Sequence, residues 1–274
     1  MRRSASALTL LALHCLGAGK AVMCSQAVAP GSETAEWIAG HVDERDTGRD
    51  SRLEMTMRIF DRQKRRRERA LTISTLRKQE PRGDRVLVRF LSPSDIRGTG
   101  LLVWEHPGAE DERFLYLPAL SRVRRIAGSE KQDSFVGSDL SYEDIGGRDF
   151  ADYTYAIADR NATWKDQAGQ PHPAWRLESR SKDSTTAYPR VVSLVRKDIF
   201  VVVAAEVFNR RDEREKLYEV RRLERPDGVW TVMDATMTNE LQQTRTDLIV
   251  NVARYNVGLT DASFSRRELE QSGK

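Results

Sequence analysis

The chain has 274 residues, of which 39% are hydrophobic and 31% are charged, and it carries 45 basic against 41 acidic side chains. This apolar fraction is enough for a buried core and argues against wholesale disorder. Beyond the first twenty-odd residues the longest apolar run, 199–205, is far shorter than the roughly 20 residues that a membrane-spanning helix needs. Nothing after the N-terminus is therefore expected to cross a bilayer.

The N-terminus has the order of a secretory signal peptide. Two arginines precede an apolar stretch over residues 7–18, and small residues follow up to Ala27. We predict a signal peptide over residues 1–27 and a single mature domain over residues 28–274. The alternatives are a residual membrane anchor or an amphipathic beginning of the first helix.

Cleavage at this site changes the chemistry that the chain can offer. Removing Arg2, Arg3 and Lys20 leaves 42 basic against 41 acidic side chains, so a nucleic-acid-binding function loses its electrostatic support. Both cysteines, Cys15 and Cys24, lie in the removed segment. The mature chain then has no disulfide, thiolate metal site or thiol nucleophile. Neither cysteine follows a small residue, which argues against a lipid anchor.

One helix is expected at the beginning of the mature chain. Residues 33–46 combine a candidate N-cap, Ser32, with Trp37, Ile38 and Val42 along one side. The helical pattern ends before a glycine, and from Leu53 onward the apolar period changes from 3.6 to 2.

A period of 2 is typical of strands with one dry and one wet face. The expected strands are 53–59, 70–78, 84–91, 100–105, 113–117, 122–126, 153–159, 174–181, 191–196, 199–209, 216–224, 229–239 and 247–253. Turn residues separate them, and no second long helical period lies between strands, which disfavours a parallel βαβ sheet. We predict a mainly β (α+β) fold built as a long antiparallel meander.

The segment 133–152 is too irregular for a strand, although it is rich in apolar residues. These are Phe135, Leu140, Tyr142, Ile145 and Phe150. A long antiparallel sheet must close, stack on a second sheet or curl round a helix to bury its apolar face. Such a segment could cross the open mouth of a curved sheet.

The sequence holds no recognisable catalytic, cofactor or metal motif. The nearest catalytic grouping is the set of acidic residues Asp139, Glu143, Asp144, Asp149 and Asp152. Paired carboxylates can perform acid–base chemistry or bind calcium, but this spacing matches no calcium loop. We predict a protein that is not an enzyme and needs no cofactor, and a hydrolase that uses these carboxylates is the weakest alternative.

Arg65, Arg66 and Arg67 belong to a basic run over residues 64–69, between two expected strands. The simplest interpretation is a solvated hairpin tip. The functional interpretation is a docking point for an acidic partner or for anionic lipid headgroups, because basic side chains near a charged membrane contribute about 1 kcal/mol each.

Several segments, taken in order, resemble a known family. They read VRFLSP (88–93), GTGLL (98–102), FLYLPAL (114–120) with RVRRI (122–126), SFVGSDLSYED (134–144), and NVARYNVGL (251–259) followed by FS (264–265). This order resembles the outer membrane lipoprotein-sorting proteins, which are similar to the periplasmic carriers LolA and LolB. The resemblance covers about residue 48 to residue 269, and any one segment alone would be weak.

The resemblance implies an unclosed antiparallel β-barrel with helices over its opening, located in the periplasm and enclosing an apolar cavity for lipid acyl chains. It implies a carrier that moves a lipoprotein or another envelope lipid between the inner and outer membranes, beside an RND-type transporter and with transient contact to a membrane surface. The alternative is a non-catalytic adaptor or sensor of a transporter or envelope-stress system on the same fold.

Apolar surface and position on or beside these segments select six candidate cavity residues. They are Met57, Phe90, Trp104, Tyr116, Phe135 and Tyr142. Met57 alternates with polar neighbours, as do Met55, Met233 and Met237. The flexible thioether of methionine suits a surface that repacks around varied ligands, and ordinary core packing explains these methionines equally well.

Overall fold

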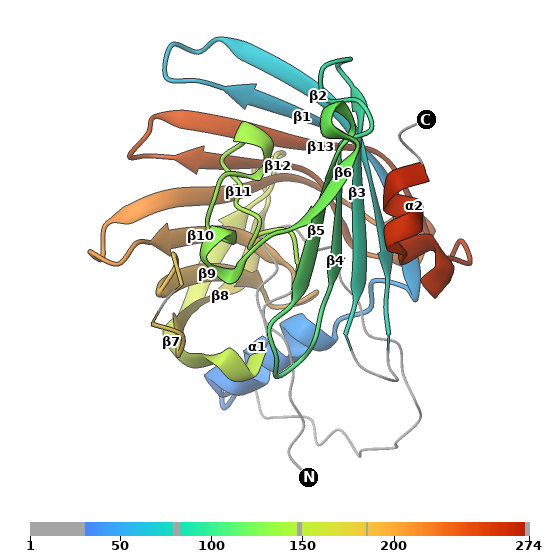
Figure 1. The fold of residues 1–274 in the computed structure, drawn as a ribbon. Coiled ribbons are helices and arrows are strands. Elements are labelled where there is room, and N and C mark those ends of the chain that lie inside the picture. The colour runs from blue at the N-terminus through green and yellow to red at the C-terminus, as the bar shows by residue number, and fades with distance from the viewer. Residues whose placement is uncertain (1–30, 79–82, 147–149, 185, 272–274) are drawn as a thin grey trace.

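The computed structural model describes residues 31–78, 83–146, 150–184 and 186–271, so the predicted signal peptide lies outside the described residues. Within them, thirteen antiparallel strands form one sheet in the order β6-β5-β4-β3-β2-β1-β13-β12-β11-β10-β9-β8-β7. The sheet curls into a half-barrel that does not close (Figure 1). The predicted fold class is confirmed. No helix in these ranges is long and apolar enough to cross a membrane.

Every strand expected from the sequence is present, with its ends moved by a few residues. The strands are β1 (Asp50–Phe60), β2 (Arg66–Leu76), β3 (Arg85–Ser92), β4 (Gly100–Trp104), β5 (Glu112–Leu117), β6 (Arg122–Arg125), β7 (Tyr153–Lys165), β8 (Pro171–Ser181), β9 (Arg190–Arg196), β10 (Val202–Phe208), β11 (Arg214–Glu224), β12 (Thr231–Asn239) and β13 (Thr244–Tyr255). Two α-helices, α1 (Ala35–Glu44) and α2 (Arg266–Gln271), flank them.

Strand alternation makes the concave face of the sheet apolar. On β1 the buried apolar residues are Leu53, Met55, Met57 and Ile59, and the residues between them face outward. Met57 lies opposite Leu248 of β13 and Arg69 of β2 in the ladder. The same alternation on the neighbouring strands joins these side chains into one continuous core on the concave side.

The two edge strands of the sheet are consecutive in the sequence. β6 ends at Arg125 and β7 begins at Tyr153, so the connection between them starts at one side of the opening and ends at the other. We call residues 126–146 of this connection the plug. The plug folds into short turns on the concave side, inside the curl of the sheet (Figure 1). The segment 133–152, which the sequence suggested could cross the open mouth, does join the two edge strands, and its apolar side chains also fill the interior.

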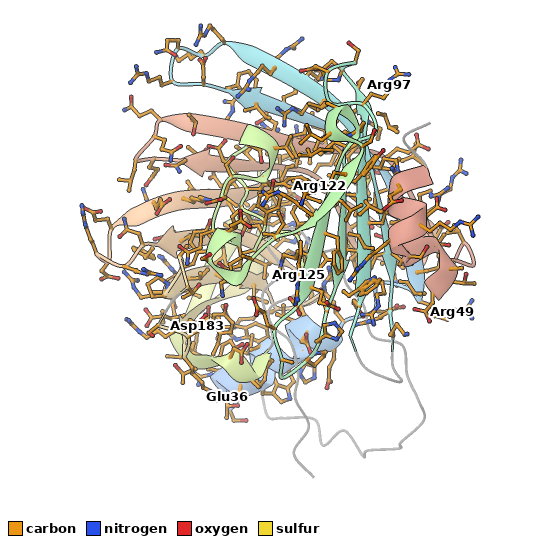
Figure 2. The ribbon with its side chains drawn as sticks, viewed as in Figure 1. Glu36, Arg49, Arg97, Arg122, Arg125 and Asp183 are labelled. Atoms are coloured by element: carbon orange, nitrogen blue, oxygen red, sulfur yellow. The ribbon has the colours of Figure 1, made fainter. Side chains whose placement is uncertain are left out.

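Charged side chains mark the opening. Arg122 and Arg125 of β6 are exposed and project from this short edge strand (Figure 2). Charges on a short edge strand oppose pairing with a strand of another chain. The open edge is thus protected against aggregation without closing the barrel.

Helix α1 covers the concave side near one end of the half-barrel (Figure 1). Its N-cap is Thr34, whose hydroxyl accepts from the backbone N–H of Trp37 at 3.1 Å, so the predicted cap at Ser32 is wrong by two residues. Ile38, on the inward side of the helix, packs against Trp175 and other apolar residues of β8 and β9.

Helix α2, which the sequence did not predict, packs on the convex face of the sheet. Phe264 and Leu269 are buried against β3, β4 and β5 there. The Arg89 guanidinium donates to the carbonyl groups of Glu268 and Leu269 at 3.0 and 3.3 Å, which satisfies two carbonyls at the end of the helix. These three strands are consequently covered on both faces.

Candidate functional site

Four of the six predicted cavity residues come together on the concave side. Met57 of β1, Phe90 of β3, and Phe135 and Tyr142 of the plug belong to one buried cluster. The ring centroid of Phe135 lies 5.6 Å from that of Phe90 and 5.7 Å from that of Tyr142. The plug therefore contacts the sheet through aromatic side chains.

The other two predicted cavity residues, Trp104 and Tyr116, lie on the convex face. The indole N–H of Trp104 donates to the carbonyl oxygen of Phe264 at 2.8 Å, and Tyr116 packs in the same cluster as Leu269. Leu101 and its alternate neighbours on β4 face the interior, so the residues between them must face outward. Trp104 and Tyr116 thus belong to the contact with the C-terminal segment.

The apolar residues of the plug occupy the interior of the half-barrel. Phe135, Leu140, Tyr142 and Ile145 are each no more than 7% exposed. The four methionines Met55, Met57, Met233 and Met237 share this cluster with them. The concave face is therefore packed by the chain's own side chains.

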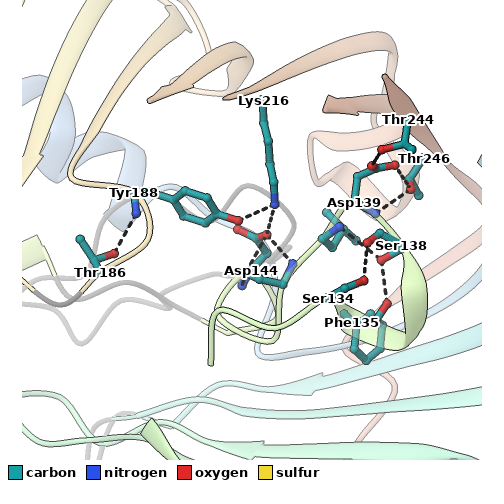
Figure 3. Close-up of polar contacts among 12 residues, drawn as sticks. Ser134, Phe135, Ser138, Asp139, Asp144, Thr186, Tyr188, Lys216, Thr244 and Thr246 are labelled. Carbon is teal, nitrogen blue, oxygen red and sulfur yellow. Dashed lines mark hydrogen bonds and ion pairs between the residues drawn. The ribbon is translucent and has the colours of Figure 1, made fainter. Parts of the chain in front are cut away.

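A buried lysine of the sheet binds the plug. Nζ of Lys216 on β11 lies 2.5 Å from the hydroxyl of Tyr188 and 4.0 Å from the carboxylate of Asp144 in the plug (Figure 3). The hydroxyl and the backbone N–H of Ser141 donate to the same carboxylate, at 3.0 and 2.8 Å. We call Ser141, Asp144, Tyr188 and Lys216 the latch.

The protonation states of the latch are set by burial and by charge. Burial, together with the charge of Asp144, raises the pKa of Tyr188 to about 12. Burial alone would lower the pKa of Lys216, but Asp144 and Tyr188 outweigh it and the pKa is raised. At neutral pH Lys216 is an ammonium and Tyr188 a neutral phenol. Neither is a ready general base for the Ser141 hydroxyl, and the group acts as an ion pair.

A second polar contact joins the plug to β13. The Thr246 hydroxyl donates to Oδ2 of Asp139 at 2.6 Å and accepts from the Asp139 backbone N–H at 3.0 Å, and the Thr244 hydroxyl donates to Oδ1 (Figure 3). Asp139 and Asp144, two members of the acidic set in the sequence, thus bind different partners. Glu143 accepts from Thr186, and Asp149 lies outside the described residues.

Asp139→Asn should lower the free energy of unfolding by about 1–3 kcal/mol, because the amide replaces charge-assisted hydrogen bonds to a buried carboxylate. Urea denaturation of the mature protein measures this loss. Asp95→Asn, at an exposed position of the β3–β4 connection, is the matched control and should change stability by less than about 0.5 kcal/mol. Equal stability of both variants would show that the Asp139 carboxylate does not hold the plug.

Strand alternation separates the predicted docking run Arg65, Arg66 and Arg67. Arg65 binds the Asp61 carboxylate at 2.7 Å in the hairpin turn, and Arg66 lies on the convex side. Arg67 donates to the Gly137 carbonyl of the plug at 3.4 Å, and Arg69, next on the same face, donates to the neighbouring plug carbonyl. All three arginines were predicted to lie at a hairpin tip, either solvated or as a docking point, and Arg67 in fact contacts the plug.

A cleft of about 660 Å³ borders the plug at the end of the half-barrel where the β1–β2, β10–β11 and β12–β13 hairpins turn. Its basic lining residues are Arg67, Arg210, Arg211 and Lys216. Lys216 is shared with the latch, so the cleft and the buried ion pair are continuous.

Comparisons with known proteins agree with this architecture. A family model described as an uncharacterized protein matches residues 82–271. A DUF1329 family protein from Desulfovibrio piger is 32% identical, with a TM-score of 0.79 over 86% of this chain and 97% of that chain. An outer membrane lipoprotein-sorting protein domain from Vibrio parahaemolyticus is 28% identical, with a TM-score of 0.78 over 87% and 98%.

A more distant structure shares the fold. The LolA superfamily protein NE2245 from Nitrosomonas europaea is 17% identical, with a TM-score of 0.66 over 86% of this chain and 99% of that chain. No curated protein matches the chain. On the identity and the coverage of the Desulfovibrio structure, the chain belongs to the DUF1329 family, with the half-open antiparallel fold of the LolA superfamily.

Proposed function

We propose that the protein is a periplasmic carrier whose interior takes the acyl chains of an envelope lipid or lipoprotein when the plug moves out. The observation that supports this proposal is the filling of the concave face. The sheet does not close over its apolar side, and the space is packed by a segment of short turns that polar contacts hold in place. Such a segment can be displaced without breaking a strand.

The energies of the two occupants are of similar size. An acyl chain of about 14 methylenes gains on the order of 11 kcal/mol by leaving water, at about 0.8 kcal/mol each. Burial of the plug's four large apolar side chains contributes a free energy of about 1.5–3 kcal/mol each, or about 6–12 kcal/mol together. In apolar burial alone, exchange of plug for ligand is therefore close to balanced, and the polar contacts of Asp139 and Asp144 add to the stability of the empty state.

The similar proteins and the N-terminus favour the same proposal. The Vibrio structure carries the name of a lipoprotein-sorting domain, and the Nitrosomonas structure that of the LolA superfamily. The predicted signal peptide would deliver the mature chain, residues 28–274, to the periplasm. An RND-type transporter of the inner membrane is the proposed partner, and cargo delivery would need transient contact with a membrane surface.

The test uses an engineered disulfide, because the mature chain has no cysteine of its own. Asp139→Cys combined with Thr246→Cys replaces a pair in direct contact between plug and β13. Oxidised, this variant should bind neither co-purified lipid in native mass spectrometry nor a fluorescent fatty acid. Reduced, it should bind both, and the reduced protein is its own control.

Two outcomes would contradict the proposal. Full binding by the oxidised variant, with cross-linking verified by mass, would show that the plug does not move. Absence of bound lipid and of probe binding in the unaltered protein would remove the carrier function and favour the adaptor or sensor.

A further inference from the structure

The cleft beside the plug is placed to contact one end of a ligand in the interior. It is lined by Ile59 of β1 and Leu140 of the plug, which both belong to the buried core cluster. Its lining residues lie at the β1–β2, β10–β11 and β12–β13 turns, whereas α1 packs near Phe200 at the β9–β10 turn, at the other end of β10. A chain that replaced the plug would therefore present its polar end here.

Two acidic residues of the cleft are already engaged. The Asp61 carboxylate binds Arg65, and the Asp139 carboxylate accepts from two threonine hydroxyls. Glu215, which precedes Lys216 on β11, also lines the cleft, and its charge acts on Lys216. Among the described residues, the Asp61 and Asp139 carboxylates therefore form no ion pair with Arg67 or Arg211.

Two of the cleft's arginines have no carboxylate partner within the described residues. The Arg67 guanidinium makes one long hydrogen bond, to the Gly137 carbonyl, and the Arg211 guanidinium makes no hydrogen bond or ion pair with the described part of the chain. Arg210 is anchored through its Nε to the Thr186 carbonyl oxygen at 3.0 Å. Arg67 and Arg211 thus present planar donor groups, which match the oxygens of phosphate and carboxylate groups.

We propose that this cleft binds the anionic headgroup of the carried amphiphile, a phosphate or a carboxylate, with Arg67 and Arg211 as its direct ligands and Lys216 at its base. This inference rests on the carrier function proposed above and adds the class of its ligand. The same cations hold the plug, because Arg67 contacts a plug carbonyl and Lys216 faces Asp144. A bound headgroup competes with those contacts and so favours release of the plug.

The experiment compares ligands that share one chain and differ in headgroup. Dodecyl phosphate, dodecanoate and neutral dodecanoylglycerol are titrated into the mature protein by calorimetry, below their micelle concentrations. The unaltered protein should bind the two anionic ligands at least about tenfold more tightly than the neutral one. Arg67→Gln combined with Arg211→Gln should remove this preference, and it should not weaken binding of dodecanoylglycerol, because the one contact that it removes among the described residues, Arg67 with the Gly137 carbonyl, holds the plug in place. Arg254→Gln, an exposed arginine on the convex side of β13, should keep the preference.

The outcomes separate this inference from the carrier function. Equal affinity of the unaltered protein for the three ligands would overturn the headgroup site and leave the carrier intact, whereas binding of none would overturn both. Inorganic phosphate distinguishes the source of the anion. Weak phosphate binding that displaces dodecyl phosphate supports a lipid headgroup, and phosphate binding as tight as that of dodecyl phosphate would overturn a lipid origin.

Discussion

Lys216→Met should lower the free energy of unfolding by about 3–5 kcal/mol, because it removes the ammonium group that faces the buried Asp144 carboxylate. The Asp144 side chain is 1% exposed, and Lys216 Nζ lies 4.0 Å from its carboxylate. The two Ser141 hydrogen bonds to this carboxylate remain, but they cannot neutralise its charge. Urea denaturation of the mature protein at neutral pH measures the loss.

Two further variants define what Lys216 contributes. Lys216→Met combined with Asp144→Asn should recover most of the stability, since no uncompensated charge is then buried, and the coupling between the two sites should exceed about 1 kcal/mol. Lys165→Met, on the exposed edge strand β7, should change stability by less than about 0.5 kcal/mol. Additive single and double variants would show that Lys216 and Asp144 act independently and that the latch is not an ion pair.

Phe135→Ala should destabilise the ligand-free protein by about 3–5 kcal/mol and should also raise its affinity for an amphiphile. Phe135 is fully buried between Phe90 and Tyr142 when the plug is in place. In the proposed loaded state the plug has moved out, so the substitution should destabilise only the ligand-free state. Each 1.4 kcal/mol by which the ligand-free state is destabilised relative to the loaded state should raise the apparent affinity about tenfold. Calorimetric titration with dodecyl phosphate measures this gain.

Phe264→Ala provides a matched control for this effect. Phe264 is also a phenylalanine that is almost fully buried, but it packs on the convex face beneath α2. Its replacement should cost similar stability and leave the affinity for the amphiphile unchanged. Weaker binding by Phe135→Ala would indicate that Phe135 contacts the ligand directly and that the plug stays in place.

Much of the fold could be predicted from the sequence because strands with one solvent-exposed face show alternating apolar and polar residues. β1, with Leu53, Met55, Met57 and Ile59 pointing inward and polar or charged residues between them, is the simplest example. The sheet face on which Trp104 and Tyr116 lie could not be predicted in this way. Their strands are buried on both sides by the plug and by α2, so they read as continuous apolar runs without a period.

The latch could not be predicted, because its members come from distant parts of the chain. Asp144 lies in the plug, Lys216 lies on β11, and Tyr188 lies just before β9, at the same end of these strands, which flank β10 in the sheet. One local signal was present. Lys216 occupies the same strand face as the buried residues Tyr218 and Val220, and a charge in that register predicts a buried partner.

The attachment of the plug to both edge strands has a consequence for delivery. Because β6 and β7 are joined through it, a displaced plug remains tethered at both ends, close to the surface it has left. It is an intramolecular competitor, whose effective concentration is set by the tether, on the order of millimolar for short flexible tethers, and does not fall on dilution. In the proposed carrier this competition would limit the affinity for cargo, and the plug would replace a departing acyl chain before water reached the apolar face.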